Sequence, residues 1–400
     1  DIPSPAQLTT LAIGERQIDV VIAVTKIGNT LILDRDTGRP VFDFDYVRAP
    51  TSTVPGERTA PYQPDLVLPE PLIETAFGPE QITDLSPEKE ADILFQLENA
   101  VYGKYAPPAL NKILIVNGLH GGAEWPGGAI DPYRGRMYTT VNLVPWQLRI
   151  FLMTAEPGLK PANASIKIYK RMCASCHGGD RNGRYHTIRE IDEGVVPTLN
   201  GISFDPRNRN FFETDYFTHR HQFTIGAPKP SQPELDELWD LMVEWDDKQV
   251  AENNFGVNYQ WSQLVDKDGL PGSKPPWGLI VAMDLTTGRQ LWARPYGEHM
   301  IDGEMRNVGK PSFGGATVTA GGVLFATGTS DRKFRAFDPD TGAELWSFEL
   351  EAAGTTPPIT FSWKGVQYVS LMATGGKFHD FERPASKLYT FRLSDDAIGG

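Results

Sequence analysis

Short apolar runs bounded by turn-forming residues recur near both ends of the chain. Residues 19–24, 112–116, 322–326 and 367–371 are runs of this kind. Runs of five or six β-branched, aliphatic and aromatic residues between glycine, asparagine and aspartate are typical of strands. The pattern therefore predicts that both ends of the chain are mainly β-structure.

The centre of the chain shows a helical pattern instead. Residues 165–172 place Ile166 and Tyr169 three positions apart, the spacing of one helix face. Further on, Ser-Gln-Pro-Glu at 231–234 is a capping box with a proline in the first turn. It opens a second predicted helix, whose apolar stripe consists of Leu235, Leu238, Trp239 and Met242.

The only two cysteines of the chain follow the first of these helices, in the stretch Cys173-Ala-Ser-Cys176-His177. The C-x-x-C-H pattern is typical of a c-type haem, in which both thiols attach the porphyrin and the histidine binds the iron. A structural zinc site would need a second pair of ligands, and a thioredoxin-like dithiol would lie in a βαβ pattern. The sequence offers neither context. We therefore expect Cys173, Cys176 and His177 to bind haem c.

The first helix, a Pro-Thr-Leu-Asn-Gly loop and the closing helix together resemble a small class I cytochrome c over residues 160–250. The resemblance implies a sixth iron ligand just before the last helix, usually a methionine. The corresponding stretch, residues 225–230, contains none. The expected distal ligand is His221 or His219, and histidine on both faces would lower the reduction potential relative to a Met/His pair. Met242 is a further candidate, although it also continues the apolar stripe.

A repeated turn marks both flanks of the central segment. Residues 282–292 and 336–346 both match A-x-D-x-x-T-G-x-x-x-W, and residues 32–42 match it with Ile and Phe at the ends. The aspartate and threonine hydrogen-bond the turn while the glycine adopts a positive φ. Each copy predicts a strand, a tight turn and a strand, and residues 128–138 form a looser copy. We expect the terminal aromatic residue to pack into the neighbouring unit.

Composition narrows the range of partners. The 400 residues carry a net charge of -13 at pH 7, with an isoelectric point near 5.1. An excess of negative charge argues against nucleic acid or an anionic membrane surface as the main partner. The sequence also lacks an apolar run of the roughly 18 residues that a membrane-spanning helix needs, so no transmembrane segment is expected.

The aromatic-terminated repeat resembles the tryptophan-docking motif of eight-bladed quinoprotein dehydrogenases, which bind pyrroloquinoline quinone (PQQ) at the propeller axis. The likeness is greatest to the membrane glucose dehydrogenase branch. It extends through Val-Thr-Lys-Ile-Gly-Asn at 24–29, Gly-Gly-Ala-Glu-Trp-Pro-Gly-Gly at 121–128 and Phe-Gly-Gly at 313–315. The sequence thus resembles a PQQ-dependent enzyme outside its central segment.

The fold class implied by this resemblance is an all-β propeller, part of an eight-bladed one, with an inserted small all-α cytochrome c domain. We expect propeller blades in residues 1–158 and 253–400, and the inserted domain in residues 159–252. The proline-rich segment 51–108, with one predicted helix at 88–98, either shapes the mouth of the pocket or is a surface loop.

The family resemblance also implies site residues. Lys26 matches the lysine that contacts the quinone oxygens and stabilises the negative charge of reduced PQQ. Trp125, together with Glu124, matches a segment in which a tryptophan lines the cofactor. Asn142 falls where relatives place a pocket asparagine, with Thr140 as its rival.

Structural roles are the alternatives for these residues. Lys26 could be a surface lysine at a strand end, and Trp125 could be a docking tryptophan of the core. His120 lies close to the same segment, where it either faces the substrate or has a structural role.

Other parts implied by the family lie outside this sequence. The general base is an aspartate that would precede Asp1 by two residues, and the calcium ligands and the tryptophan that stacks on PQQ lie further upstream. The repeats account for about half of eight blades, and an open half-propeller exposes sheet faces and edges. We therefore expect a second polypeptide to complete the propeller and to bring the catalytic aspartate and most of the Ca²⁺ site.

The expected function is that of a subunit of a periplasmic dehydrogenase. It would oxidise an alcohol or sugar hydroxyl through PQQ, with Lys26 as its own catalytic residue, and pass electrons to haem c. An external acceptor such as a cytochrome or a quinone would follow. Covalent haem attachment, on the outer side of the energy-transducing membrane, implies the periplasm. The alternative is a haem c electron-transfer or interaction subunit on a propeller that does not bind PQQ.

Overall fold

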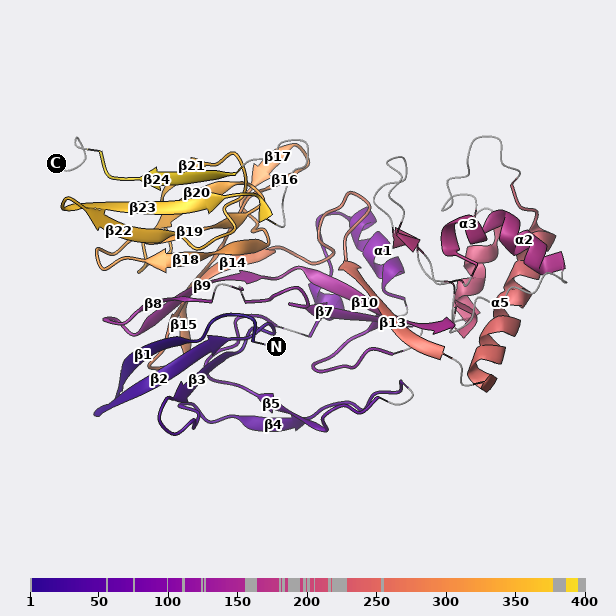
Figure 1. Ribbon diagram of the computed structural model, residues 1–400, viewed down its shortest axis with the longest axis horizontal. Helices are drawn as coiled ribbons and strands as arrows, with labels where there is room; N and C mark the ends of the chain where they lie inside the picture. Colours follow the sequence, from indigo (N-terminus) through magenta and orange to yellow (C-terminus); the bar gives the residue numbers. More distant parts are fainter. Residues whose placement is uncertain are drawn as a thin grey trace.

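Stacked β-sheets make up the larger part of the structure, and a group of helices lies at one end (Figure 1). The computed structural model describes residues 2–54, 57–74, 76–98, 100–109, 112–123, 125, 127–154, 164–179, 181, 184–185, 195–196, 199, 202–204, 206–214, 217, 229–252, 255–376 and 386–394. Among these residues, none of the helices combines the length and the apolar character needed to cross a membrane.

Four antiparallel sheets of the described chain lie face against face at the left of Figure 1. Sheet 1 contains β1 (Gln7–Ile13), β2 (Arg16–Val24) and β3 (Thr30–Asp34). Sheet 2 contains β8 (Ala129–Asp131), β9 (Arg136–Asn142), β14 (Gly278–Asp284) and β15 (Arg289–Pro295). Sheet 3 contains β18 (Ser312–Val318), β19 (Leu324–Thr329), β20 (Lys333–Phe337) and β21 (Glu344–Glu349), and sheet 4 contains β22 (Ile359–Trp363), β23 (Val366–Ala373) and β24 (Lys387–Phe391).

Apolar side chains that alternate along these strands fill the spaces between neighbouring sheets. Alternation arises because successive residues of a strand point to opposite faces. Sheets 1 and 2 share a core that includes Ile22, Val24, Val141 and Met283. Tyr138, Ala282, Leu324 and Phe337 pack between sheets 2 and 3, and Phe334, Leu350, Val369 and Leu371 pack between sheets 3 and 4. The strands expected at 19–24, 322–326 and 367–371 are therefore confirmed as β2, β19 and β23, and the strand expected at 112–116 is confirmed in a separate sheet.

A long excursion leaves sheet 2 between β9 and β14, which are paired although far apart in sequence. It contains β10 (Pro145–Thr154) and β13 (Phe255–Gln263), which pair antiparallel from Trp146–Gln263 to Thr154–Phe255. We call this pair the arm. Together with β7 (Ile113–Asn117) and β6 (Ala100–Val101), the arm forms a separate sheet, and the helices lie beyond its far end (Figure 1).

The helical segment at the end of the arm has a core of its own. It contains α2 (Ala164–Met172), α3 (Ala174–His177), α5 (Gln232–Glu252), the 3₁₀ helices η2 (Ile202–Phe204) and η3 (Pro206–Phe212), and the short strands β11 (Arg184–Tyr185) and β12 (Val195–Val196). Its buried residues include Tyr169, Phe212, Leu235, Leu238 and Met242. The two predicted helices and the apolar stripe are confirmed, whereas the domain boundaries at 158 and 252 stay a prediction.

One half of the expected capping box is observed, and the Ser231 hydroxyl donates to the Glu234 carboxylate at 3.0 Å. The backbone N–H of Ser231 donates to Glu234 Oε2 at 2.9 Å, and the N–H of Leu235 donates to the Ser231 carbonyl. The hydrogen bonds that Glu234 accepts from Ser231 and from Arg171 lower the pKa of Glu234 to about 2. Glu234 thus keeps its negative charge at the positive end of the helix dipole.

The proline-rich segment holds short elements that lie outside the four sheets. They are β4 (Asp45–Arg48), β5 (Tyr62–Asp65), η1 (Pro79–Gln81) and α1 (Pro87–Gln96), and the hairpin of β16 (His299–Ile301) and β17 (Glu304–Arg306) lies between sheets 2 and 3 in the sequence. The helix expected at 88–98 is therefore confirmed. Buried Lys89 of α1 donates to Asp266 Oδ2 at 3.0 Å, which ties this segment to the excursion from sheet 2.

The three close copies of the repeat form the same turn. In each, the first aspartate accepts backbone N–H bonds within the turn: Asp34 from Thr37 at 2.9 Å, Asp284 from Thr286 at 2.8 Å and Asp338 from Thr341 at 2.8 Å. The glycines that close the turns have φ of +70° at Gly38, +72° at Gly288 and +70° at Gly342. The backbone bond from Thr341 is the main reason that the pKa of Asp338 lies below its usual value.

The aromatic residue at the end of one copy packs on the turn of the next. Trp292 of sheet 2 donates from Nε1 to the Pro339 carbonyl of sheet 3 at 3.0 Å. A Cβ atom at Gly342 would lie only 2.7 Å from Cε3 of this indole. In the same way, Phe42 of sheet 1 lies against Gly288 of sheet 2. The expected packing into the neighbouring unit is therefore confirmed for Phe42 and Trp292, whereas Trp346 at the end of the third copy is 40% exposed.

The looser copy at 128–138 has the same turn chemistry at a different place. Asp131 Oδ1 accepts from the backbone N–H of Tyr133 and of Arg134, at 3.0 and 3.1 Å. This turn joins β8 and β9, the first two strands of sheet 2, whereas the close copies follow the third strand of their sheets. The same turn chemistry therefore occurs at different positions in a sheet, and the turn alone does not show which strands it joins.

We predict that Gly342→Ala destabilises the protein more than Gly38→Ala. Both substitutions place a Cβ at a φ of +70°, which costs about 1–2 kcal/mol. A Cβ at Gly38 meets nothing within 4 Å, whereas at Gly342 it overlaps Trp292 and costs a further ~1–3 kcal/mol. Urea unfolding of the two variants measures the difference, and equal losses of stability would contradict the docking role of Gly342.

Candidate functional site

A glycine-rich turn at residues 118–122 lies at the centre of the candidate site. The backbone N–H of Gly122 donates to the Lys26 carbonyl at 2.9 Å. A Cβ atom at Gly122 would lie 2.6 Å from that carbonyl oxygen, and one at Gly118 would lie 2.8 Å from it. Glycine is required here because the loop that carries Lys26 approaches the turn so closely.

Trp125 lies over the same turn. A Cβ atom at Gly121 would be 3.0 Å from Trp125 Nε1, so the indole covers the open side of a glycine whose φ is +108°. The indole is 47% exposed, which contradicts the alternative of a docking tryptophan in the core. Glu124, the other residue expected in this segment, lies outside the described residues.

Asn142, at the end of β9, joins the turn to sheet 3. Its side-chain Nδ2 donates to the Gly121 carbonyl at 3.0 Å and to the Ser312 carbonyl at 3.2 Å. Its Oδ1 accepts from the Ser312 N–H at 2.7 Å, and its own N–H donates to the Gly122 carbonyl at 2.7 Å. Buried Asn142 therefore positions the backbone on both sides, and its contact with a quinone stays a prediction.

Thr140 precedes Asn142 by two residues and points to the same side of β9. Its Oγ1 is buried and has no hydrogen-bond partner among the residues that the structure describes. An unpaired buried hydroxyl is costly, so it marks a place where a polar ligand atom would be favourable. Thr140 therefore stays a rival of Asn142 as a ligand-binding residue.

An aromatic cluster continues the site towards the arm. The His120 ring lies 5.0 Å from Trp146, 4.9 Å from Trp261 and 5.7 Å from Phe313, measured between ring centroids. Trp146 belongs to β10 and Trp261 to β13, so both strands of the arm contribute. These contacts place the His120 ring among three aromatic side chains, and whether it also faces the substrate stays a prediction. The sequence offered no signal for the cluster because the rings come from four separate segments.

The C-x-x-C-H motif occupies one helical turn at the other end of the arm. Cys173 is buried, and the His177 N–H donates to its carbonyl at 2.8 Å. His177 is buried as well, and the Tyr169 hydroxyl donates to the next carbonyl, that of Gly178, at 2.7 Å. Attachment of a porphyrin to two thiols and one imidazole fits a single turn set against an apolar core.

The distal side of this site is described only in part. His219, His221 and the side chain of Cys176 lie outside the described residues. Met242 is buried in the core of the helical segment, where its Sδ lies 3.9 Å from Arg181 Nη1. Among the described residues, no group of three or more His, Cys, Asp and Glu side chains is arranged to bind a metal ion.

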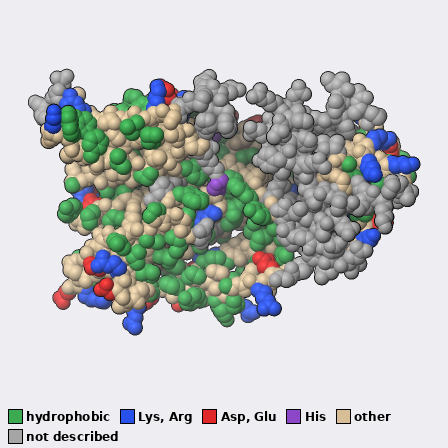
Figure 2. All heavy atoms as spheres, viewed as in Figure 1, with side chains coloured by type: hydrophobic (Ala, Val, Ile, Leu, Met, Phe, Trp, Pro, Cys, Tyr) green, Lys and Arg blue, Asp and Glu red, His purple; other side chains and the backbone are tan. Residues whose placement is uncertain are grey.

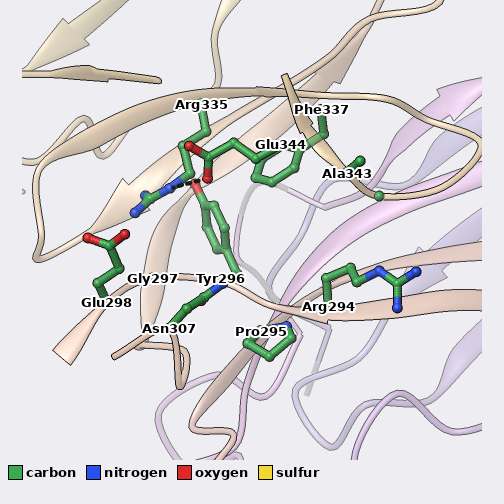
Figure 3. A pocket seen from close by; sticks show the side chains of 11 residues that line it. Arg294, Pro295, Tyr296, Gly297, Glu298, Asn307, Arg335, Phe337, Ala343 and Glu344 are labelled. Atoms are coloured by element: carbon green, nitrogen blue, oxygen red, sulfur yellow. Dashed lines mark ion pairs between the residues drawn. The ribbon is translucent and has the colours of Figure 1, made fainter. Parts of the chain in front are cut away.

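A separate pocket of about 190 Å³ lies between sheets 2 and 3 (Figure 3). Arg335 points into it between Tyr296 and Glu344. Its guanidinium pairs with Asp331 Oδ2 at 2.6 Å and with Glu344 Oε2 at 3.3 Å. Two carboxylates thus balance the buried cation, and this pocket contains none of the residues predicted from the sequence.

We predict that Asn142→Ala lowers the free energy of unfolding by about 2–3 kcal/mol, because buried backbone groups of Gly121 and Ser312 lose their partners. Exposed Asn307→Ala is the matched control and should change it by less than about 0.5 kcal/mol. Denaturant unfolding gives both values. Unchanged hydrogen exchange at the Ser312 amide in the Asn142 variant would contradict the role of Asn142 in joining the turn to sheet 3.

Comparison with known proteins places the chain in a family. The model of the family described as "PQQ: Glucose/ethanol/alcohol dehydrogenase, beta-propeller domain" matches residues 1–175 and 191–369. The chain therefore belongs to the PQQ-dependent alcohol and sugar dehydrogenases, a family of oxidoreductases with a β-propeller.

Individual relatives agree with this family. The chain is 26% identical over 392 residues to the glycerol dehydrogenase large subunit of Gluconobacter oxydans (strain 621H), covering 94% of the chain and 43% of the relative. It is 24% identical to the quinoprotein glucose dehydrogenase of the same organism, covering 94% and 39%. A solved europium-containing methanol dehydrogenase superposes with a TM-score of 0.46 at 14% identity, covering 98% of the chain and 47% of that structure. The chain thus spans less than half the length of these relatives.

Proposed function

We propose that this chain forms part of a periplasmic quinohaemoprotein dehydrogenase that oxidises an alcohol or sugar hydroxyl. The single observation that carries the proposal is the meeting of Lys26, Trp125 and Asn142 at one glycine turn. These residues come from three separate segments of a chain that belongs to a PQQ-dependent family. Curated relatives named for glycerol and glucose support an alcohol or a sugar as the substrate class.

The residues of the turn fit a planar, negatively charged cofactor. When bound, PQQ accepts two electrons from the substrate, whose hydroxyl-bearing carbon is oxidised. Lys26 supplies a positive charge beside the quinone oxygens and favours the reduced form electrostatically. Trp125 offers its exposed indole as a wall, and the hydroxyl of Thr140 offers a buried hydrogen bond. Asn142 keeps the turn in place.

The helical segment supplies the next electron carrier in this proposal. Cys173, Cys176 and His177 would bind haem c, with His221 or His219 on the distal side. Bound haem accepts electrons one at a time and passes them to an external acceptor such as a cytochrome or a quinone. Covalent haem attachment is the basis for assigning the periplasm. The segment between about 159 and 252 is accordingly proposed as an inserted cytochrome c domain.

Further propeller blades would complete the active site. The outer face of sheet 4 exposes a set of apolar side chains, and hydrophobic residues reach the surface over this sheet at the upper left of Figure 2. Its exposed members are Ile359, Phe361, Trp363, Met372 and Leu388. The facing sides of sheets 1 and 2, of sheets 2 and 3 and of sheets 3 and 4 are buried against one another, and the exposed apolar face of sheet 4 would suit one more blade.

Those additional blades, whether in a second polypeptide or not, would contribute the aspartate base and most of the Ca²⁺ ligands. The base would take the proton of the substrate hydroxyl, while Ca²⁺ would polarise the quinone. The contribution of the described residues would then be the cation at Lys26 and the walls of the pocket.

We predict that Lys26→Ala weakens PQQ binding about 10- to 100-fold, the loss expected when a hydrogen bond to a charged group disappears. Lys26→Arg keeps the charge and should lose less, and Lys112→Ala is the control, because exposed Lys112 lies at the opposite end of β7 from the turn. Equilibrium titration of the apo-protein with PQQ measures all three. Equal affinities for the Lys26 and Lys112 variants would refute the proposed contact.

We also predict that the purified protein carries one haem that survives denaturation, and that Cys173→Ser with Cys176→Ser abolishes it. Thioether bonds are covalent, so mass spectrometry of the denatured chain detects the haem. Met242→Leu is the control, since a core residue should leave attachment intact. A native chain without added mass would end the haem proposal while leaving the PQQ proposal open.

The second candidate function, a haem subunit without PQQ, is favoured only by the incomplete set of catalytic groups in this chain. Addition of an alcohol or a sugar to the oxidised protein separates the two. Haem reduction that requires PQQ and Ca²⁺ supports the dehydrogenase, and haem that stays oxidised under all conditions supports the alternative.

A further inference from the structure

A buried ion pair lies beside the C-x-x-C-H turn, and neither the sequence pattern nor the proposed function accounts for it. Arg181, four residues after His177, is 3% exposed. Its Nη1 donates to Oδ1 of fully buried Asp246 on α5 at 2.8 Å. The other oxygen, Oδ2, accepts from the Ser203 N–H at 3.0 Å and from its hydroxyl at 2.7 Å. The carboxylate is thus held between two different segments.

The backbone of Arg181 is fixed as tightly as its side chain. Its φ of +62° is unfavourable for a residue with a side chain. Its N–H donates to the Gly178 carbonyl at 3.4 Å, directly after His177, and its carbonyl accepts from the Leu199 N–H at 2.8 Å. Arg181 therefore connects three parts: the turn that carries His177, the Leu199 segment and α5.

Stability alone is a poor explanation for such a pair. Burial of two charges costs several kcal/mol, which the attraction between them only partly offsets. Burial in fact lowers the pKa of Arg181, although Asp246 acts in the opposite direction. The guanidinium also lies 4.9 Å from the Trp245 ring, a contact that an aromatic or aliphatic residue would fill without the cost. A strained position with two buried charges next to a redox segment points to an electrostatic role.

We propose that Arg181 and Asp246 form a positioning pair that sets the reduction potential of the haem bound at Cys173, Cys176 and His177. The inference rests on the proposed haem site. Reduction adds one electron to the iron, from Fe(III) to Fe(II), and removes one positive charge from a low-dielectric region. An unpaired Asp246 carboxylate there would oppose reduction, and an unpaired Arg181 cation would favour it. The intact pair keeps the region neutral and holds the Leu199 segment against the turn.

Potentiometric titration of the haem absorbance in single and double variants tests this proposal. Arg181→Gln should lower the potential and Asp246→Asn should raise it, each by about tenfold in the reduction equilibrium constant, which is about 59 mV for one electron. The double variant Arg181→Gln with Asp246→Asn should return close to the native potential. A merely structural role would move both single variants in the same direction.

Two further variants guard against loss of folding. Arg181→Lys keeps the charge and should change the reduction potential by no more than a third as much as Arg181→Gln does. Arg171→Gln breaks the more exposed ion pair between Arg171 of α2 and Glu234 of α5, and should leave the potential unchanged. If Arg181→Gln does not fold, the reduction potential of Asp246→Asn, compared with that of Arg171→Gln, still tests the proposal.

The outcomes are distinguishable. A native chain without covalent haem would overturn the haem proposal and this inference together. A haem whose potential does not rise in Asp246→Asn, or moves as far in Arg171→Gln, would overturn this inference alone and leave the haem site standing.

Discussion

The absence of a Cβ atom at Gly342, in the turn that receives Trp292, is a constraint on which the stacking of sheets 2 and 3 depends. A Cβ atom at Gly342 would overlap the indole of Trp292, so a bare backbone is needed there for a ring of one sheet to pack on the turn of the next. The same contact fixes the spacing of the sheets and hence the apolar cores between them.

The same principle of close backbone approach shapes the candidate quinone site. The loop of Lys26 meets the turn at 118–122 because Gly118 and Gly122 leave room for its carbonyl. Asn142 then locks that turn to Ser312 of the next sheet. A lysine on one loop and a tryptophan on another are therefore positioned through Asn142, an uncharged residue of β9. This division between positioning groups and reacting groups is common in binding sites on rigid scaffolds.

The sequence predicted those features that depend on local chemistry. Turn residues, capping box and apolar stripe involve neighbours in the chain, and Asp338, Ser231 and Leu235 behave as their patterns indicate. The partners of Asn142 and Arg181 could not be predicted, because Ser312 and Asp246 lie far along the chain and no motif links them. The looser copy at 128–138 shows the same limit. Its turn could be recognised in the sequence, but its position in sheet 2 could not, because that position depends on pairing with β14, which follows the whole excursion.

The arm explains how a helical segment and a β-sheet can coexist in one chain. β9 and β14 are neighbours in sheet 2 whatever lies between them, and the entropic cost of closing a loop grows only slowly with its length. The nine paired positions of β10 and β13 bring the two ends of the helical segment together. For the pairing of β9 with β14, the arm and the helical segment are therefore equivalent to the loop at the tip of one long hairpin. Evolution could lengthen, exchange or delete what this tip carries without disturbing the register of a single strand in the stack.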